Sequence, residues 1–326
     1  MRRAYQVAAA IGLFLSGGAL ASQPEAAPEP PPQDQASSPP PSDATSLDEN
    51  AIVVTGRRLP DKEVNRFIYN MLRPLSVGQD DQYPRLDEPF CPSAIGFNEA
   101  AETVIEARMR RVAAAAGVKL GEEGTCKPNV HLVRVEDGRQ MIRQLRKTAS
   151  RSAFGEMTLQ ERASLEAREG PVFGWHQTLR FGADSGQIIS GNAVDLGPGD
   201  PSALNFNFIY ENPRLRLGAN TAFRHATVLI ERAALDDVSA IQLADFAVMR
   251  GLVPAREDEH RRGARTEDTI LNLFDPALDP DERLPSLGRT DLALLTALYA
   301  APDNVNANRQ RGRMVVTFRK VLDELD

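Results

Sequence analysis

The sequence predicts an α+β fold in which a small mixed or antiparallel sheet packs with helices. Long runs with apolar residues near helical spacing, such as Glu99 to Ala116, alternate with short β-branched or apolar runs, such as Val130 to Val135. These runs extend from residue 51 to the end without an internal repeat. We therefore expect one globular domain over residues 51–326, roughly 270 residues and near the upper size of a single domain.

The first 21 residues have the three parts of a Sec-type signal peptide. Arg2 and Arg3 form a basic start, Val7 to Leu15 is apolar, and Ala19-Leu20-Ala21 is a small-x-small cleavage signal. A transmembrane anchor is the alternative, but a span needs about 20 apolar residues, and this run is shorter. We predict cleavage between Ala21 and Ser22, no transmembrane span in the mature chain, and a periplasmic or secreted protein.

Residues 22–50 consist mainly of Pro, Gln, Ser, Ala and Glu. A segment with almost no large apolar side chain cannot bury enough surface to offset the entropy lost on ordering. We predict a disordered, partly polyproline-II linker, which either has no further role or is a spacer that reaches a partner.

The charge of the chain disfavours nucleic acid as a partner. Lys and Arg number 38 against 45 Asp and Glu, a net charge of -7, whereas phosphate binding needs a concentrated basic surface. Two arginine clusters are expected to be solvated faces, one on a helix and one in a loop. They are Arg108, Arg110 and Arg111, and Arg261, Arg262 and Arg265.

Cys91 and Cys126 are the only cysteines. In an oxidising compartment an isolated pair favours one disulfide, whose Cα atoms must then lie within about 7 Å. A catalytic thiol is the alternative; it needs a nearby His and leaves one Cys unexplained.

The first half of the domain reads as strands and capped helices. Gly117 ends the helix that begins after Asn98, and Gly138 opens a helix that follows strand 130–135. His131 lies on that strand without a second ligand at metal spacing, so we expect a half-buried strand residue. The other elements expected here are a strand over residues 51–58 and a helix over residues 61–72.

The second half begins with a capping box at Thr158-Leu159-Gln160-Glu161, followed by a charged helix. The segment Pro171 to Phe181 reads as a strand and carries Trp175 and His176, and residues 182–205 read as a long loop that could form a binding surface. Ser239 caps a helix that Gly251 is expected to end. The remaining elements expected are a strand over residues 223–230 and helices over residues 240–250, 266–274, 289–299 and 304–325.

The last hundred residues share an order of elements with a known class. A strand, Thr227 to Glu231, precedes the helix Ala240 to Phe246, a strip from Asp268 to Phe274 follows, and a helix from Leu287 through Tyr299 closes the domain. This order resembles the zincin metallopeptidases, especially the metzincin-like branch and its secreted bacterial relatives. The resemblance implies a zincin-like C-terminal half in which the helix after Ser239 takes the place of the active-site helix.

The helix after Ser239 departs from the zincin pattern at the positions where zincins carry their zinc ligands. Zinc requires two His at i and i+4 with a carboxylate between them, as in His-Glu-x-x-His. Here Ile241 and Asp245, or Gln242 and Phe246, occupy the candidate positions. We therefore expect no metal and no cofactor, and an apolar helix buried against the sheet through a stripe of residues. The stripe comprises Ile241, Ala244, Val248 and Leu252, widened by Leu243, Phe246 and Ala247.

These observations favour an exported envelope protein whose zincin-like domain is structural or recognises an unknown envelope protein or ligand, and is not an enzyme. A hydrolase with an unfamiliar site is the first alternative; its candidate residues are Asp245, Gln242, Trp175 and His176, and their convergence in one pocket would favour it. A small-ligand or metal-binding envelope protein is the second alternative. Asp236, Asp237 and Asp245 could form a cluster of carboxylates near the start of the helix. The alternative is that Asp236 and Asp237 favour the positive end of the helix and that Asp245 is exposed or paired.

Overall fold

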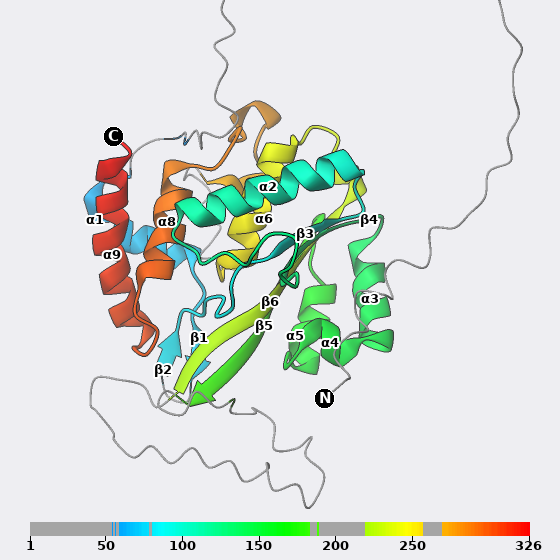
Figure 1. Ribbon diagram of the computed structural model, residues 1–326, viewed down its shortest axis with the longest axis horizontal. Coiled ribbons are helices and arrows are strands. Elements are labelled where there is room, and N and C mark those ends of the chain that lie inside the picture. The colour runs from blue at the N-terminus through cyan, green and yellow to red at the C-terminus, as the bar shows by residue number, and fades with distance from the viewer. Residues whose placement is uncertain are drawn as a thin grey trace, which may run out of the picture. The chain divides into compact units, whose positions relative to one another are not determined.

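A mixed four-stranded sheet lies between two groups of helices (Figure 1). The structure is a computed structural model and describes residues 54, 56, 59–77, 80–182, 188, 219–256 and 269–326. All of these belong to one compact unit that begins at Ile52. The α+β prediction is confirmed, and the sheet is mixed rather than antiparallel.

The sheet has the strand order β3-β4-β6-β5. Strands β3, β4 and β6 run parallel, and β5 pairs with β6 in the antiparallel sense. Between β3 and β4, Ser93 lies opposite His131, and between β4 and β6, His131 lies opposite Thr227. The bounds are β3 Pro92–Ile95, β4 Val130–Val135, β5 Val172–Gly182 and β6 Ala219–Glu231, and a separate hairpin joins β1 Leu75–Val77 to β2 Asp80–Gln82.

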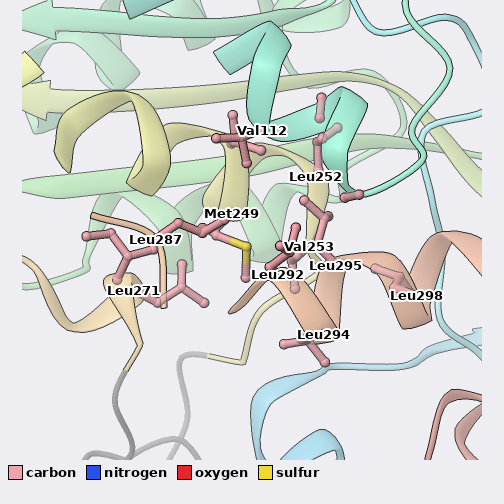
Figure 2. Packing of buried hydrophobic residues seen from close by; sticks show 14 of the residues in the cluster. Val112, Met249, Leu252, Val253, Leu271, Leu287, Leu292, Leu294, Leu295 and Leu298 are labelled. Atoms are coloured by element: carbon pink, nitrogen blue, oxygen red, sulfur yellow. The ribbon is translucent and has the colours of Figure 1, made fainter. Parts of the chain in front are cut away.

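The first face of the sheet carries the main hydrophobic core. Helix α6 lies against this face and against α2, and α8 and α9 pack together beside them. Figure 2 shows Met249 and Leu252 of α6 gathered with Val112 of α2 and Leu292 and Leu295 of α8. The helices on this side are α1 Asp61–Met71, α2 Glu99–Ala115, α6 Ala240–Leu252, α8 Arg289–Ala300 and α9 Ala307–Glu324.

The opposite face of the sheet is covered by a smaller core around Phe173 and Trp175. Its helices are α3 Gly138–Thr148, α4 Ser150–Phe154 and α5 Leu159–Glu166. The capping box predicted for the third of these helices is confirmed, because Thr158 Oγ1 accepts from the Glu161 N–H and the Glu161 side chain accepts from the Thr158 N–H.

Several predicted element ends are confirmed by their local geometry. Asn98 caps α2 by accepting a hydrogen bond from the Ala101 N–H, and Gly117 follows the helix at φ +74°. Ser239 caps α6 with a capping box that includes Gln242. His131 is a half-buried strand residue, as predicted.

Gly251 was predicted to end its helix, and this was wrong, because α6 continues through Leu252. A Cβ atom on Gly251 would lie 2.6 Å from Cγ1 of Val130 on β4. The glycine therefore serves the close approach of helix to sheet and does not act as a stop signal.

The segment predicted as a helix over residues 266–274 is also different. Within its described part, from Thr269 onward, only a single 3₁₀ turn forms, η3 at Ile270–Asn272. Thr269 caps this turn. The turn has three residues and is therefore much shorter than the helix that the sequence pattern predicted. Two further 3₁₀ turns are η2 Arg232–Ala234 and η4 Pro280–Glu282.

Cys91 and Cys126 form a disulfide, which confirms the predicted pairing. Their Cα atoms lie 6.1 Å apart, within the distance that the prediction required. Gly121 gives the bond its space, since a Cβ there would lie 2.7 Å from Cβ of Cys126. The disulfide closes a loop that contains α2.

The predicted signal peptide, the linker over residues 22–50, most of loop 182–205 and the cluster Arg261, Arg262 and Arg265 lie outside the described residues. So does most of the predicted strand 51–58; Val54 and Gly56, which are described, are not in a strand. Within the described ranges, no helix is both long and apolar enough to cross a bilayer.

Candidate functional site

Helix α6 is the element that places the candidate residues, because it lies in the core between α2 and the sheet. All residues from Leu243 to Leu252 are buried, as the apolar composition of the helix predicted. Gln242 lies in the half-buried first turn of the helix, where its side chain completes the capping box and donates to the Leu284 carbonyl at 2.8 Å. The polar group of this residue is thus occupied in holding the helix start.

Asp245 is fully buried in α6 and is paired with Arg108 of α2. The guanidinium donates to both carboxylate oxygens, from Nε to Oδ1 at 2.7 Å and from Nη2 to Oδ2 at 2.9 Å. The Ser286 hydroxyl and the Leu287 N–H also donate to Oδ2, at 2.9 Å and 2.7 Å. A buried carboxylate satisfied in this way joins α2, α6 and the start of the closing segment.

Arg108 was predicted to lie on a solvated face, and this was wrong, because only 3% of its surface is exposed. The prediction considered only neighbours along the chain, whereas the partner that allows Arg108 to be buried, Asp245, lies 137 residues further on. The neighbouring Arg110 and Arg111 are half-buried.

Asp291 is a second buried carboxylate that the sequence reading did not identify. It accepts from the Ile270 N–H at 2.7 Å and the Gly288 N–H at 3.0 Å, and from the Thr269 hydroxyl. These bonds tie the strip after residue 268 to the start of α8. The spacing of Gly288 and Asp291 is that of a helix cap, which is the signal that could have revealed it.

Trp175 and His176 are consecutive on β5 and therefore point to opposite faces of the sheet. The Trp175 indole N–H donates to the Ala153 carbonyl at 2.8 Å in the smaller core. His176 Nε2 lies 3.0 Å from the Gly251 carbonyl at the end of α6, and its ring packs against Phe223. The four candidate residues are thus each held by separate partners, and none of them lines the pocket described below.

A polar row crosses the sheet on the side of the smaller core. The Ser93 hydroxyl lies 2.7 Å from His131 Nδ1, and the His131 and His225 rings are nearly parallel with their centroids 6.5 Å apart. Burial, together with the nearby His225, lowers the pKa of His131 to about 4, so His131 is neutral near pH 7. Among the described residues, no three His, Cys, Asp or Glu side chains are placed to hold a metal ion.

A pocket of about 360 Å³ opens where the end of α6 meets the start of β5 and the η3 segment. This volume is at the lower end of small-molecule sites. Arg250 and Phe246, four residues apart on α6, contribute one wall. The remaining lining residues are Glu169, Gly170, Pro171, Val172, Ala255, Arg256, Leu271, Asn272, Phe274, Asp275 and Pro276.

Arg250 is the buried charged group of this pocket, with 7% of its surface exposed. Its Nη2 donates to the Gly174 carbonyl at 3.3 Å, and Arg168 Nη1 donates to the same carbonyl at 3.1 Å. A Cβ on Gly174 would lie 2.9 Å from Nε of Arg250, so this glycine leaves the space that the guanidinium occupies. The spacing of Phe246 and Arg250 on one helix could have indicated a shared face, but the glycine contact could not be read from the sequence.

Burial and neighbouring arginines lower the pKa of two cationic groups near this pocket. Burial and the charge of Arg73 lower the pKa of Arg168 to about 10. Burial, followed by the charges of Arg250 and Arg168, lowers the pKa of His176 to about 3, against the opposing effect of its bond to Gly251. The pocket itself is lined by two arginines, Arg250 and Arg256, and by two carboxylates, Glu169 and Asp275. No family model, curated protein or solved structure matches this chain.

Proposed function

We propose that this chain is an exported recognition domain of the cell envelope, zincin-like in its C-terminal half and without catalytic machinery on α6. The disulfide supports the exported location, because such bonds persist in oxidising compartments. The signal-peptide pattern of residues 1–21 supports the same location.

The burial of Asp245 is the observation that carries the non-catalytic assignment. It is the only carboxylate of α6, and Arg108, Ser286 and Leu287 already donate to its oxygens. A general base needs an oxygen within hydrogen-bond reach of a substrate or a bound water. The side chains of α6 also do not fit a zinc ion, because the helix contains no His or Cys.

The test is thermal unfolding of the purified chain before and after treatment with a strong chelator, with the metal content measured in parallel. We expect an unchanged melting temperature, because packing and the Arg108–Asp245 pair hold α6 in place. A large loss of stability on chelation would contradict the proposal and favour the alternative of a metal-binding envelope protein.

A second candidate function is a serine hydrolase built on Ser93 and His131. It is favoured by the 2.7 Å separation of the Ser93 hydroxyl and His131 Nδ1, the reach of a nucleophile and its base. In this reaction Ser93 Oγ would attack an acyl carbonyl and pass its proton to His131, which would return it to the leaving group. Water would then release the acyl group by the same transfer.

An organophosphonate probe separates the two candidates, because it labels activated serines covalently. The hydrolase predicts labelling of the intact chain that Ser93→Ala abolishes and Ser152→Ala, on the exposed surface of α4, does not. Absence of labelling would leave the recognition domain as the assigned function.

A further inference from the structure

We propose that the exposed face of α1 binds an anionic lipid surface of the cell envelope. The inference rests on the exported location proposed above and names the partner that the recognition domain meets there. Two features of this face carry it: a row of cations without carboxylate partners, and an exposed tyrosine in line with them.

The row of cations follows the outward side of α1. Lys62 and Arg66 are exposed and four residues apart, so they lie on one side of the helix, and Arg73 is exposed just beyond the helix end. Within the part of the chain that the structure describes, none of these three side chains makes a hydrogen bond or an ion pair. Their charges are therefore not offset by a partner in the fold.

Arg311 of α9, the helix that packs beside α1, adds a positive charge to this face (Figure 1). Its guanidinium lies over the ring of Tyr69 on α1, 5.2 Å from the ring centroid. It also donates to Oδ1 of Asn308 at 2.8 Å and to the Tyr83 hydroxyl at 3.4 Å. All of these partners are neutral, so the charge of Arg311 persists.

The carboxylates of α1 do not cancel the row. Asp61 and Glu63 are the neighbours of Lys62 in the sequence, so they project about 100° to either side of it. Asp61 lies 3.9 Å from Arg319, and Glu63 is half-buried. Other surface arginines do lie beside carboxylates, as Arg224 does. In a chain with 45 acidic side chains against 38 Lys and Arg, a row of uncompensated cations indicates an anionic partner.

Tyr69 favours a lipid surface over a compact anion. It lies one turn after Arg66 on the same side of α1 and is 41% exposed. The guanidinium of Arg256 contacts the ring as well, 5.0 Å from its centroid. Tyrosine combines an apolar ring with a polar hydroxyl and is therefore enriched at membrane–water interfaces, where Lys and Arg are attracted to anionic headgroups. Cations and an aromatic ring in one exposed line fit a flat anionic surface.

The experiment is co-sedimentation of the exported chain, which begins at Ser22, with lipid vesicles. Starting at Ser22 prevents the apolar run of residues 7–15 from inserting into any vesicle by itself. One set of vesicles is phosphatidylcholine, and the other is an equal mixture of phosphatidylcholine and phosphatidylglycerol. We expect at least about tenfold tighter binding to the anionic vesicles, and loss of this preference at high salt.

Three variants locate the binding. The double variant Lys62→Gln, Arg66→Gln should bind the anionic vesicles at least about tenfold more weakly, because two headgroup contacts are lost. Tyr69→Ser keeps every charge and should also weaken binding, because it removes the interfacial ring. The matched control is Lys119→Gln, Lys147→Gln, which removes two exposed cations elsewhere and should bind like the unaltered chain.

The proposal is overturned if the chain shows no preference for anionic vesicles, or if the α1 double variant and its control weaken binding equally. An acidic polypeptide is the other partner that a cationic face could take. Tighter binding of soluble polyglutamate than of the anionic vesicles would favour it and overturn the lipid assignment. None of these outcomes changes the expected result of the chelator test, so a failure of lipid binding is distinguishable from a failure of the proposed function.

Discussion

Asp245 shows how a single buried charge determines whether α6 can take part in chemistry or only in structure. Asp245→Asn keeps the size of the side chain but leaves Arg108 buried without its counter-charge. We predict a loss of about 3–5 kcal/mol in the free energy of unfolding, measured by urea denaturation. The matched control is Asp236→Asn, an exposed carboxylate ahead of the same helix, which should change it by less than about 0.5 kcal/mol. Equal effects of the two changes would contradict the structural role of Asp245.

His176 is the residue through which acid should weaken the domain. Its pKa falls from 6.5 to about 3 in the folded chain, mainly through burial, so the unfolded chain takes up a proton first as the pH drops. The stability that depends on neutral His176 is fully present above about pH 6.5 and is lost as the pH falls toward 3. Urea midpoints between pH 7.5 and 5 should therefore fall less steeply in His176→Gln, whose amide can still donate to the Gly251 carbonyl. His131→Gln should also reduce the fall, and by a similar amount, since the folded pKa of His131, about 4, likewise lies below this pH range. The same slope in His176→Gln and the unaltered chain would rule out this role.

At the scale of elements, α6 is held by packing, and Phe246 is its largest buried side chain. Phe246→Ala removes a ring that contacts Phe274 and leaves a cavity in the core, so we predict a loss of about 3–5 kcal/mol in the free energy of unfolding. Val316→Ala on α9 is the control, because 65% of Val316 is exposed. Thermal unfolding of both variants, with and without chelator, measures the difference. An unchanged free energy of unfolding in Phe246→Ala would mean that something other than core packing holds the helix.

At the scale of the whole molecule, the disulfide links the start of β3 to the chain that enters β4. Its two cysteines are 35 positions apart, and closing such a loop in the unfolded chain is worth about 4 kcal/mol in the chain-entropy account. We predict that the double variant Cys91→Ala, Cys126→Ala loses stability of this order in urea denaturation. Dithiothreitol should lower the stability of the unaltered chain and leave the double variant unchanged. A reductant effect of equal size in both would show that it does not act through this bond.

The sequence by itself determined the fold class, the disulfide and the approximate bounds of most of the longer elements, but not strands β1, β2 and β3 or helix α4. Local rules were sufficient for these: Asn98, Thr158 and Ser239 cap helices through bonds to residues three positions away, and β4 follows from a run of six residues of which four are apolar. A disulfide between two lone cysteines follows from their number once an oxidising compartment is predicted. The apolar composition of α6 also determined that it would be buried.

Only the tertiary structure decided the roles of individual polar residues. Arg108 and Asp245 are ordinary helix residues in the sequence, and they pair because the fold brings together two residues that are 137 positions apart. The role of Gly251 depends on a neighbour in β4, and that of Gly174 depends on a guanidinium from α6. The pocket is likewise assembled from three separate stretches of chain. Periodicity and capping report only on neighbours along the chain, whereas a binding site and a buried ion pair are properties of contacts across it.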